Sequence, residues 1–186
     1  ACGIIIGVVI QSGLATKVSK LIANVGSTYL IVALLITMLG CMLLGMALPT
    51  VAAYLVANVL FVPTLIGLDI QPLQANMFVF YFGIMAQITP PVCVASFTAA
   101  GIAGADSMKT GLTGFAYALV AFLVPFIFIY DPSILLIGTP LEIVKGTLIL
   151  FLGTYLLASG MAGFFLVPLN RIERTILQSS SSFRRQ

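Results

Sequence analysis

Long runs of apolar residues, interrupted at a few short points, are the dominant pattern of the chain. Four stretches contain no charged residue: residues 29–68, 73–104, 111–130 and 146–169. A helix of about 20 apolar residues is long enough to cross the hydrocarbon core of a bilayer, and unbroken apolar runs of this length are typical of helices. The pattern therefore predicts an all-α integral membrane protein, with transmembrane helices at residues 111–130 and 146–169.

Three further segments differ from these runs. Residues 1–14 are interpreted as a partial transmembrane helix, so we expect the chain to belong to a larger protein. Residues 15–27 have a helical period, with Leu14, Val18, Leu21, Ile22 and Val25 on one face and Lys17, Lys20 and Asn24 on the other. This predicts an amphipathic helix in the membrane interface, with a helical connecting loop as the alternative. Residues 170–186 are expected to form a basic tail.

The run at residues 29–68 contains a turn that is itself apolar. Two helical segments meet at Gly45-Met46-Ala47-Leu48-Pro49-Thr50, and no charged residue lies between Lys20 and Asp69. Two spanning helices would normally be joined by polar residues, whereas an apolar turn is better placed inside the protein at membrane depth. We therefore expect a re-entrant helical hairpin that enters and leaves on one side. Two full spans joined by a tight turn are the alternative.

The run at residues 73–104 is broken at Pro90 and Pro91. Neither proline can donate a backbone hydrogen bond, and Pro90 disfavours α geometry at Thr89. The carbonyls of residues 86–88 are therefore expected to lose their helical donors, and an unpaired carbonyl in hydrocarbon costs several kcal/mol. The pattern predicts a broken transmembrane helix whose free carbonyls face a cation or a water-filled cavity. A simple proline kink is the alternative.

Composition narrows the class of protein. The 186 residues are 61% hydrophobic and 7% charged, with a mean hydropathy of +1.20, whereas a soluble domain has about 25% charged residues. All eight basic and five acidic residues lie in predicted loops, membrane edges or the tail, so no acid or base is available at mid-membrane. We therefore expect a protein that is not an enzyme. Cys2, Cys41 and Cys93 are expected to be reduced and buried.

The backbone groups at the two helix breaks could bind ligands. The C-terminal end of a helix presents free carbonyls and the N-terminal end presents free amides. Two breaks side by side could hold a sodium ion between carbonyls and an anionic group against amides. Hydroxyl or amide oxygens of Thr50, Thr89 and Asn58 could add ligands that suit a hard cation. Taken singly, such a threonine is more often bonded back to its own helix.

At these same residues the chain resembles a known family. The stretches Leu44-Gly45-Met46-Ala47-Leu48-Pro49-Thr50-Val51-Ala52-Ala53-Tyr54, Ile88-Thr89-Pro90-Pro91-Val92 and Ala99-Ala100-Gly101-Ile102-Ala103 are similar to the large permease subunit of tripartite ATP-independent periplasmic (TRAP) transporters. They are most similar to the fused-permease branch that works with TAXI-type binding proteins. The chain would then be the C-terminal half of that subunit, with the first repeat absent.

The resemblance implies an elevator-type secondary transporter with two inverted repeats. Each repeat has a re-entrant hairpin and a broken helix, and this chain would be the second repeat. The candidate cation ligands are Gly45, Leu48, Thr50, Ala86, Gln87, Ile88, Thr89 and Pro91, and the candidate substrate contacts are Pro49, Thr50, Thr89, Pro90 and Val92.

The expected function is import of a small organic acid, a carboxylate, driven by a cation gradient across the bacterial inner membrane. No cofactor is expected beyond Na⁺ or H⁺ as the coupling ion. Expected partners are a soluble periplasmic substrate-binding protein, a small membrane subunit or fused domain, the N-terminal half of the permease and the lipid bilayer, but no nucleic acid. A channel-like or scaffolding membrane subunit without coupled transport is the alternative.

Basic residues predict the orientation in the membrane, since they gather on the cytoplasmic side. With the tail inside, Lys109 and the arginines 171, 174, 184 and 185 are cytoplasmic, whereas Lys17, Lys20 and Lys145 are outside. We therefore predict that a cysteine at position 69 reacts with a membrane-impermeant maleimide added from outside, and that one at position 182 does not. The reverse labelling pattern would show that the orientation is wrong.

Overall fold

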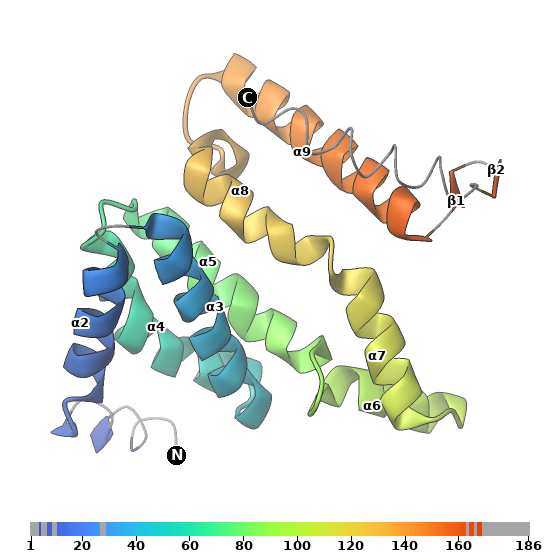
Figure 1. Ribbon diagram of the computed structural model, residues 1–186, viewed down its shortest axis with the longest axis horizontal. Coiled ribbons are helices and arrows are strands. Elements are labelled where there is room, and N and C mark those ends of the chain that lie inside the picture. Colours follow the sequence, from blue (N-terminus) through green and yellow to red (C-terminus); the bar gives the residue numbers. More distant parts are fainter. Residues whose placement is uncertain are drawn as a thin grey trace. The chain divides into compact units, whose positions relative to one another are not determined.

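The computed structural model describes residues 4, 7–8, 11–26, 29–162, 164–165 and 167–168. The chain divides into two compact units, Ala1–Phe115 and Ala116–Gln186, and each is described by itself. Figure 1 labels the elements. In the first unit they are α2 (Leu14–Gly26), α3 (Leu30–Ala47), α4 (Thr50–Ile66), α5 (Pro72–Met85), the 3₁₀ turn η1 (Ala86–Ile88), α6 (Val94–Ala103) and α7 (Ser107–Ala118), whose last residues pass into the second unit.

The first unit is built on four packed helices. Helix α4 lies against α2, α3 and α5, and α3 also contacts α2 and α5 (Figure 1). Their shared core consists of fully buried large side chains: Ile22, Leu34, Val56, Leu65, Phe78, Val79 and Phe82. Two of these rings, Phe78 and Phe82, meet edge to face with centroids 4.8 Å apart. This packing places the end of α3 and the end of α5 next to each other, because the two helices run in contact.

Polar side chains join α4 to α5. The Tyr54 hydroxyl donates to Asn76 Oδ1 over 3.2 Å, and Asn58 Nδ2 donates both to the Tyr54 hydroxyl and to Asn76 Oδ1. Tyr54 also meets Phe80 edge to face, with ring centroids 5.3 Å apart. Tyr54 and Asn58 are one helical turn apart and so share a face of α4. Hydrogen bonds of this kind between helices fix their register in apolar surroundings.

The second unit contains one long helix and several short elements. They are η2 (Ala121–Leu123), α8 (Val124–Tyr130), η3 (Pro132–Leu135), α9 (Pro140–Ala162) and the antiparallel strands β1 (Phe164–Phe165) and β2 (Val167–Pro168). Helix α9 contacts η3 and β1. Its first turn is held by a reciprocal cap. The Thr139 amide donates to Glu142 Oε2 over 2.9 Å, and the Glu142 amide donates to the Thr139 hydroxyl oxygen over 3.5 Å.

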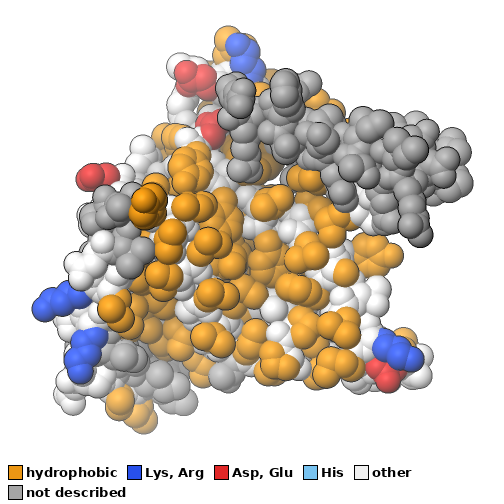
Figure 2. Space-filling view, viewed as in Figure 1, with side chains coloured by type: hydrophobic (Ala, Val, Ile, Leu, Met, Phe, Trp, Pro, Cys, Tyr) orange, Lys and Arg blue, Asp and Glu red, His pale blue; other side chains and the backbone are white. Residues whose placement is uncertain are grey.

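Apolar side chains cover much of the described surface. Figure 2 shows them across most of the visible face, with the basic and acidic groups toward its edges. Within the described residues, one helix, Pro140–Met161, is long and apolar enough to cross a membrane. The helices Ser107–Ala118 and Ala121–Tyr130 are long and apolar enough only when taken together, and they are bent by 51° at the break between them. The helices Leu30–Met46, Thr50–Ile66 and Val94–Ala103 are apolar but shorter.

The structure corrects one detail of the sequence interpretation. The expected continuous helix at residues 111–130 is interrupted between Ala118 and Ala121. Pro125 explains the break, since it lacks an amide hydrogen and its ring clashes with the carbonyl of the residue four positions earlier. On α2, Leu21 is 66% exposed and Ile22 beside it is 1% exposed, so the protein itself covers only part of the predicted apolar face.

Other predicted segments have slightly different bounds in the structure or lie outside the described residues. The last predicted span, residues 146–169, is helical from Pro140 to Ala162. Helix α2 covers residues 15–26 of the segment predicted at residues 15–27, and residue 27 lies outside the described part. Of the partial helix at residues 1–14, only residues 4, 7–8 and 11–14 are described, and the basic tail at residues 170–186 lies outside the described part.

The α4–α5 hydrogen bonds generate a stability prediction. Asn76→Leu removes the oxygen that accepts from both Tyr54 and Asn58, and such interhelical bonds contribute about 0.6–2 kcal/mol each. We expect a lower midpoint of thermal unfolding for the full-length protein in detergent. Thr98→Val is the matched control, because its hydroxyl is exposed and bonds only to the Val94 carbonyl of its own helix. Equal midpoints for the two variants would mean that the α4–α5 bonds are not stabilising.

Candidate functional site

The tip of the first helical pair is a two-residue turn. Helix α3 ends at Ala47, Leu48 is extended with φ −126° and ψ 149°, and α4 begins at Thr50. Pro49 precedes α4 with φ −56°, a value that its ring sets in advance, and its carbonyl accepts from the Ala53 amide over 2.9 Å. The last carbonyls of α3 therefore end at an apolar turn with no charged side chain in the hairpin.

The second break lies between α5 and α6. Helix α5 tightens into the 3₁₀ turn η1, and Thr89 then turns extended with φ −96° and ψ 125°, as the following proline requires. The Pro90–Pro91 peptide bond is cis. Helix α6 begins at Val94. The segment at residues 73–104 is therefore two helices with a non-helical interval at the prolines.

The two breaks meet at Gly45. A β-carbon at this position would lie 2.5 Å from the Ala86 β-carbon and 2.8 Å from the Gly83 carbonyl oxygen. Only glycine allows the backbone of α3 to approach the end of α5 this closely. Gly45 and Ala86 were predicted from the sequence, whereas Gly83, which takes part in the contact through its backbone carbonyl, was not. The family signature around Gly45 gave no sign of that partner.

A side chain also connects the breaks. Gln87 Nε2 donates to the Gly45 carbonyl and to the Leu48 carbonyl, each over 3.1 Å. These two carbonyls belong to the end of α3, where helical donors run out. With the Gly45–Ala86 contact, the structure thus brings four of the predicted cation-site residues together: Gly45, Leu48, Ala86 and Gln87.

The carbonyls of the second break are partly paired, which corrects one expectation. Residues 86–88 were expected to have free carbonyls, but the Ala86 carbonyl accepts from the Thr89 amide over 3.2 Å. The buried Thr89 hydroxyl donates to the Met85 carbonyl over 2.8 Å, which is the ordinary bond back to its own helix. That hydroxyl keeps its lone pairs, so its oxygen remains able to accept a hydrogen bond or a cation.

The remaining predicted residues are less closely joined. No hydrogen bond recorded for the described residues links Thr50 to the second break, and none links Pro91 or Val92 to the hairpin tip. Pro49, Pro91 and Val92 are exposed, and Pro90 and Ile88 are half-buried. Asn58 is engaged with Tyr54 and Asn76 in the α4–α5 contact. No group of three or more histidine, cysteine or acidic side chains that could hold a metal ion occurs among the described residues.

These features define a helical membrane protein whose candidate site is made of neutral oxygen and nitrogen atoms at two helix breaks. The family model "Tripartite ATP-independent periplasmic transporter, DctM component" matches residues 1–143, and the chain belongs to this family. It is thus part of a transport permease, a class of membrane protein that is distinct from the enzymes. No curated protein and no solved structure matches the chain.

The contact at Gly45 generates a matched pair of substitutions. Gly45→Ala must push the hairpin tip away from Ala86 and Gly83, and such overpacking costs about 1–3 kcal/mol. Gly83→Ala adds the same methyl group to α5, where nothing lies within 4 Å of it, and a helical Gly→Ala change is favourable by up to about 1 kcal/mol. In the full-length permease we expect uptake and thermal stability to fall only in Gly45→Ala. Equal behaviour of the two variants would contradict the close approach.

Proposed function

We propose that this chain is the second inverted repeat of a TRAP permease that imports a small organic acid together with a cation. The family membership supports a transport permease, and one observation supports the site: Gln87 reaches across to the Gly45 and Leu48 carbonyls. The pairing of a re-entrant hairpin with a broken helix suits an elevator-type transporter, because both breaks can move as one packed body. We assign the chain to the TAXI-type branch on the motifs around Pro49 and Pro90.

The proposed cation site uses backbone and side-chain oxygens. In the structure Gln87 Nε2 donates to both carbonyls. A half-turn about its last side-chain bond exchanges Nε2 for Oε1, which would then face the same space as the carbonyls of Gly45 and Leu48. Three oxygens around one point suit a hard monovalent cation such as sodium. The Thr89 hydroxyl oxygen is a further candidate ligand in the second break.

The proposed substrate contacts are the amides at the starts of α4 and α6. Helix N-terminal ends carry unpaired amide groups and a partial positive charge, which attract a carboxylate. Thr50 begins α4, and the exposed Pro91 and Val92 lead into α6. No basic side chain lies in either segment, so the backbone would supply the positive potential. The other half of the site would come from the first repeat of the permease.

The chain would work in a membrane as one part of a larger transporter. We place it in the bacterial inner membrane with its C-terminus in the cytoplasm. A soluble periplasmic binding protein would deliver the substrate, and a small membrane subunit or fused domain and the N-terminal half of the permease would complete the transporter. Coupling to Na⁺ or H⁺ distinguishes this function from that of a channel-like subunit, since only coupled transport depends on the cation gradient and saturates with substrate.

The test is substrate uptake by the full-length permease and its binding protein in proteoliposomes, over a range of sodium concentration and pH. For Gln87→Leu we expect the cation concentration at half-maximal uptake to rise roughly tenfold, which corresponds to about 1.4 kcal/mol, because one ligand is lost. Gln87→Glu retains a side-chain oxygen and should need less cation than Gln87→Leu.

Thr98→Val is the control for this test, since its hydroxyl bonds only within α6. An unchanged cation requirement in Gln87→Leu would mean that Gln87 only ties the two breaks together. Uptake by the wild-type protein that neither saturates nor responds to a gradient would contradict coupled transport itself.

A further inference from the structure

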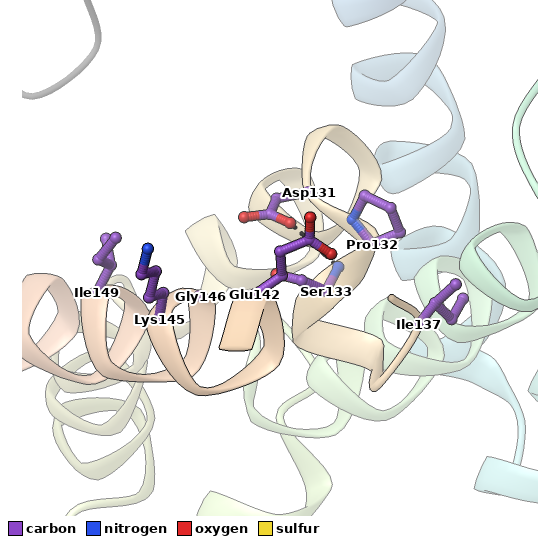
Figure 3. A pocket seen from close by; sticks show the side chains of 8 residues that line it. All are labelled: Asp131, Pro132, Ser133, Ile137, Glu142, Lys145, Gly146 and Ile149. Atoms are coloured by element: carbon purple, nitrogen blue, oxygen red, sulfur yellow. Dashed lines mark hydrogen bonds between the residues drawn. The ribbon is translucent and has the colours of Figure 1, made fainter. Parts of the chain in front are cut away.

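A polar cavity lies where α9 begins, in the second unit. Its volume is about 420 Å³, and its lining consists of Asp131, Pro132, Ser133, Ile137, Glu142, Lys145, Gly146 and Ile149 (Figure 3). The carboxylates of Asp131 and Glu142 accept hydrogen bonds from backbone amides, those of Ser133 and Thr139 respectively. These bonds use one oxygen of each carboxylate, so each retains acceptor capacity toward the cavity. Lys145 adds one positive charge on the next turn of α9.

An apolar groove continues from this cavity along α8 and α9. It has a volume of about 210 Å³ and shares Asp131, Gly146 and Ile149 with the polar cavity. The rest of its lining is almost entirely aliphatic: Leu123, Ile127, Ile134, Leu150, Gly153, Thr154 and Leu157. At Gly153 an added β-carbon would meet nothing within 4 Å, so this part of the groove is open. The two spaces together form one cleft that is charged at one end and apolar along its length.

The dimensions of the cleft match one leaflet of a membrane. From Gly146 to Leu157 the helix rises by roughly 16 Å at about 1.5 Å per residue, and half the hydrocarbon core of a bilayer is about 15 Å. Helix α9 is itself long and apolar enough to span. Glu142 and Lys145 lie in its first two turns, where a spanning helix emerges from hydrocarbon. The charged end of the cleft therefore coincides with the head-group level and the groove with the acyl-chain region.

From this geometry we infer that the α8–α9 cleft binds a phospholipid with a primary-ammonium head group, of the phosphatidylethanolamine class. The lipid ammonium donates hydrogen bonds to the Asp131 and Glu142 carboxylates, its phosphate pairs with Lys145, and one acyl chain lies in the groove past Gly153. Two carboxylates and one lysine disfavour an anionic lipid, because its head group adds negative charge without an ammonium. A choline head group carries the positive charge but has no N–H to donate.

The experiment uses the full-length permease, purified in mild detergent and incubated with phosphatidylethanolamine, phosphatidylcholine or phosphatidylglycerol that carry the same acyl chains. Native mass spectrometry then counts the lipids that stay bound. We expect the wild-type protein to retain phosphatidylethanolamine at least several-fold better than the other two. Gly153→Leu fills the groove and should reduce retention about tenfold, while Lys145→Gln should reduce it several-fold.

The matched control is Gly101→Leu, which adds the same side chain to a helix at another open position and should retain lipid as the wild-type protein does. Equal retention of the three lipids would overturn the assignment of the head-group pocket. Retention in Gly153→Leu at the wild-type level would overturn the assignment of the groove. A photo-crosslinker at position 149 that captures another helix of the permease instead of lipid would show that protein fills the cleft, which also overturns the inference.

Discussion

The need to pair every backbone carbonyl and amide away from water governs this structure. A continuous helix meets that need by itself, but this chain interrupts its helices at Pro49, at Pro90–Pro91 and before Pro125. At each interruption the last carbonyls of a helix lose their usual donors four residues on, and some of them, such as Ala86, Leu119 and Val120, accept from the amide three residues on instead. At the first two interruptions, a side chain of one break supplies donors to the other. Gln87, beside the Pro90–Pro91 break, donates to the Gly45 and Leu48 carbonyls at the end of α3. The bond forms only because the two breaks lie against each other.

That mutual arrangement depends on side chains of very different size. Glycine at position 45 lets α3 touch the end of α5, whereas Phe78 and Phe82 fill the space between the helices farther along. On the other side of α5, Asn76 ties the helix to α4 through Tyr54 and Asn58. Because α5 is held on two sides in this way, its C-terminal end has a defined position. A binding site made of backbone atoms requires such a fixed position.

The two units use charge differently. The two breaks of the first unit bring together neutral groups, the Gln87 amide and the Gly45 and Leu48 carbonyls. The start of α9 instead gathers two carboxylates and a lysine beside an apolar groove, which suits a ligand with a charged head and a long apolar tail. In membrane proteins charged side chains stay at the interface because burying them in hydrocarbon is costly, which agrees with the position of Glu142 and Lys145 in the first two turns of α9.

The sequence by itself determined most of the helical segments and two of the breaks between them. Apolar run length and the missing amide of proline are local properties, and so the apolar turn at Leu48–Pro49 and the break at Pro90–Pro91 were predictable, as was the neutral character of both. The motifs at these breaks also indicated the family. The same local rule was available at Pro125, yet the long apolar run around it suggested one continuous helix, and the break was missed.

Only the tertiary structure decided which atoms meet. Gln87 bonds to carbonyls 42 and 39 positions earlier in the chain, and no local pattern specifies a partner at that distance. The close approach of Gly45 to Ala86 depends on how α3 packs against the end of α5, and the exposure of Leu21 depends on how α2 lies on α3 and α4. Contacts of this kind follow from packing between helices, whereas helix formation and helix ends follow from the residues themselves.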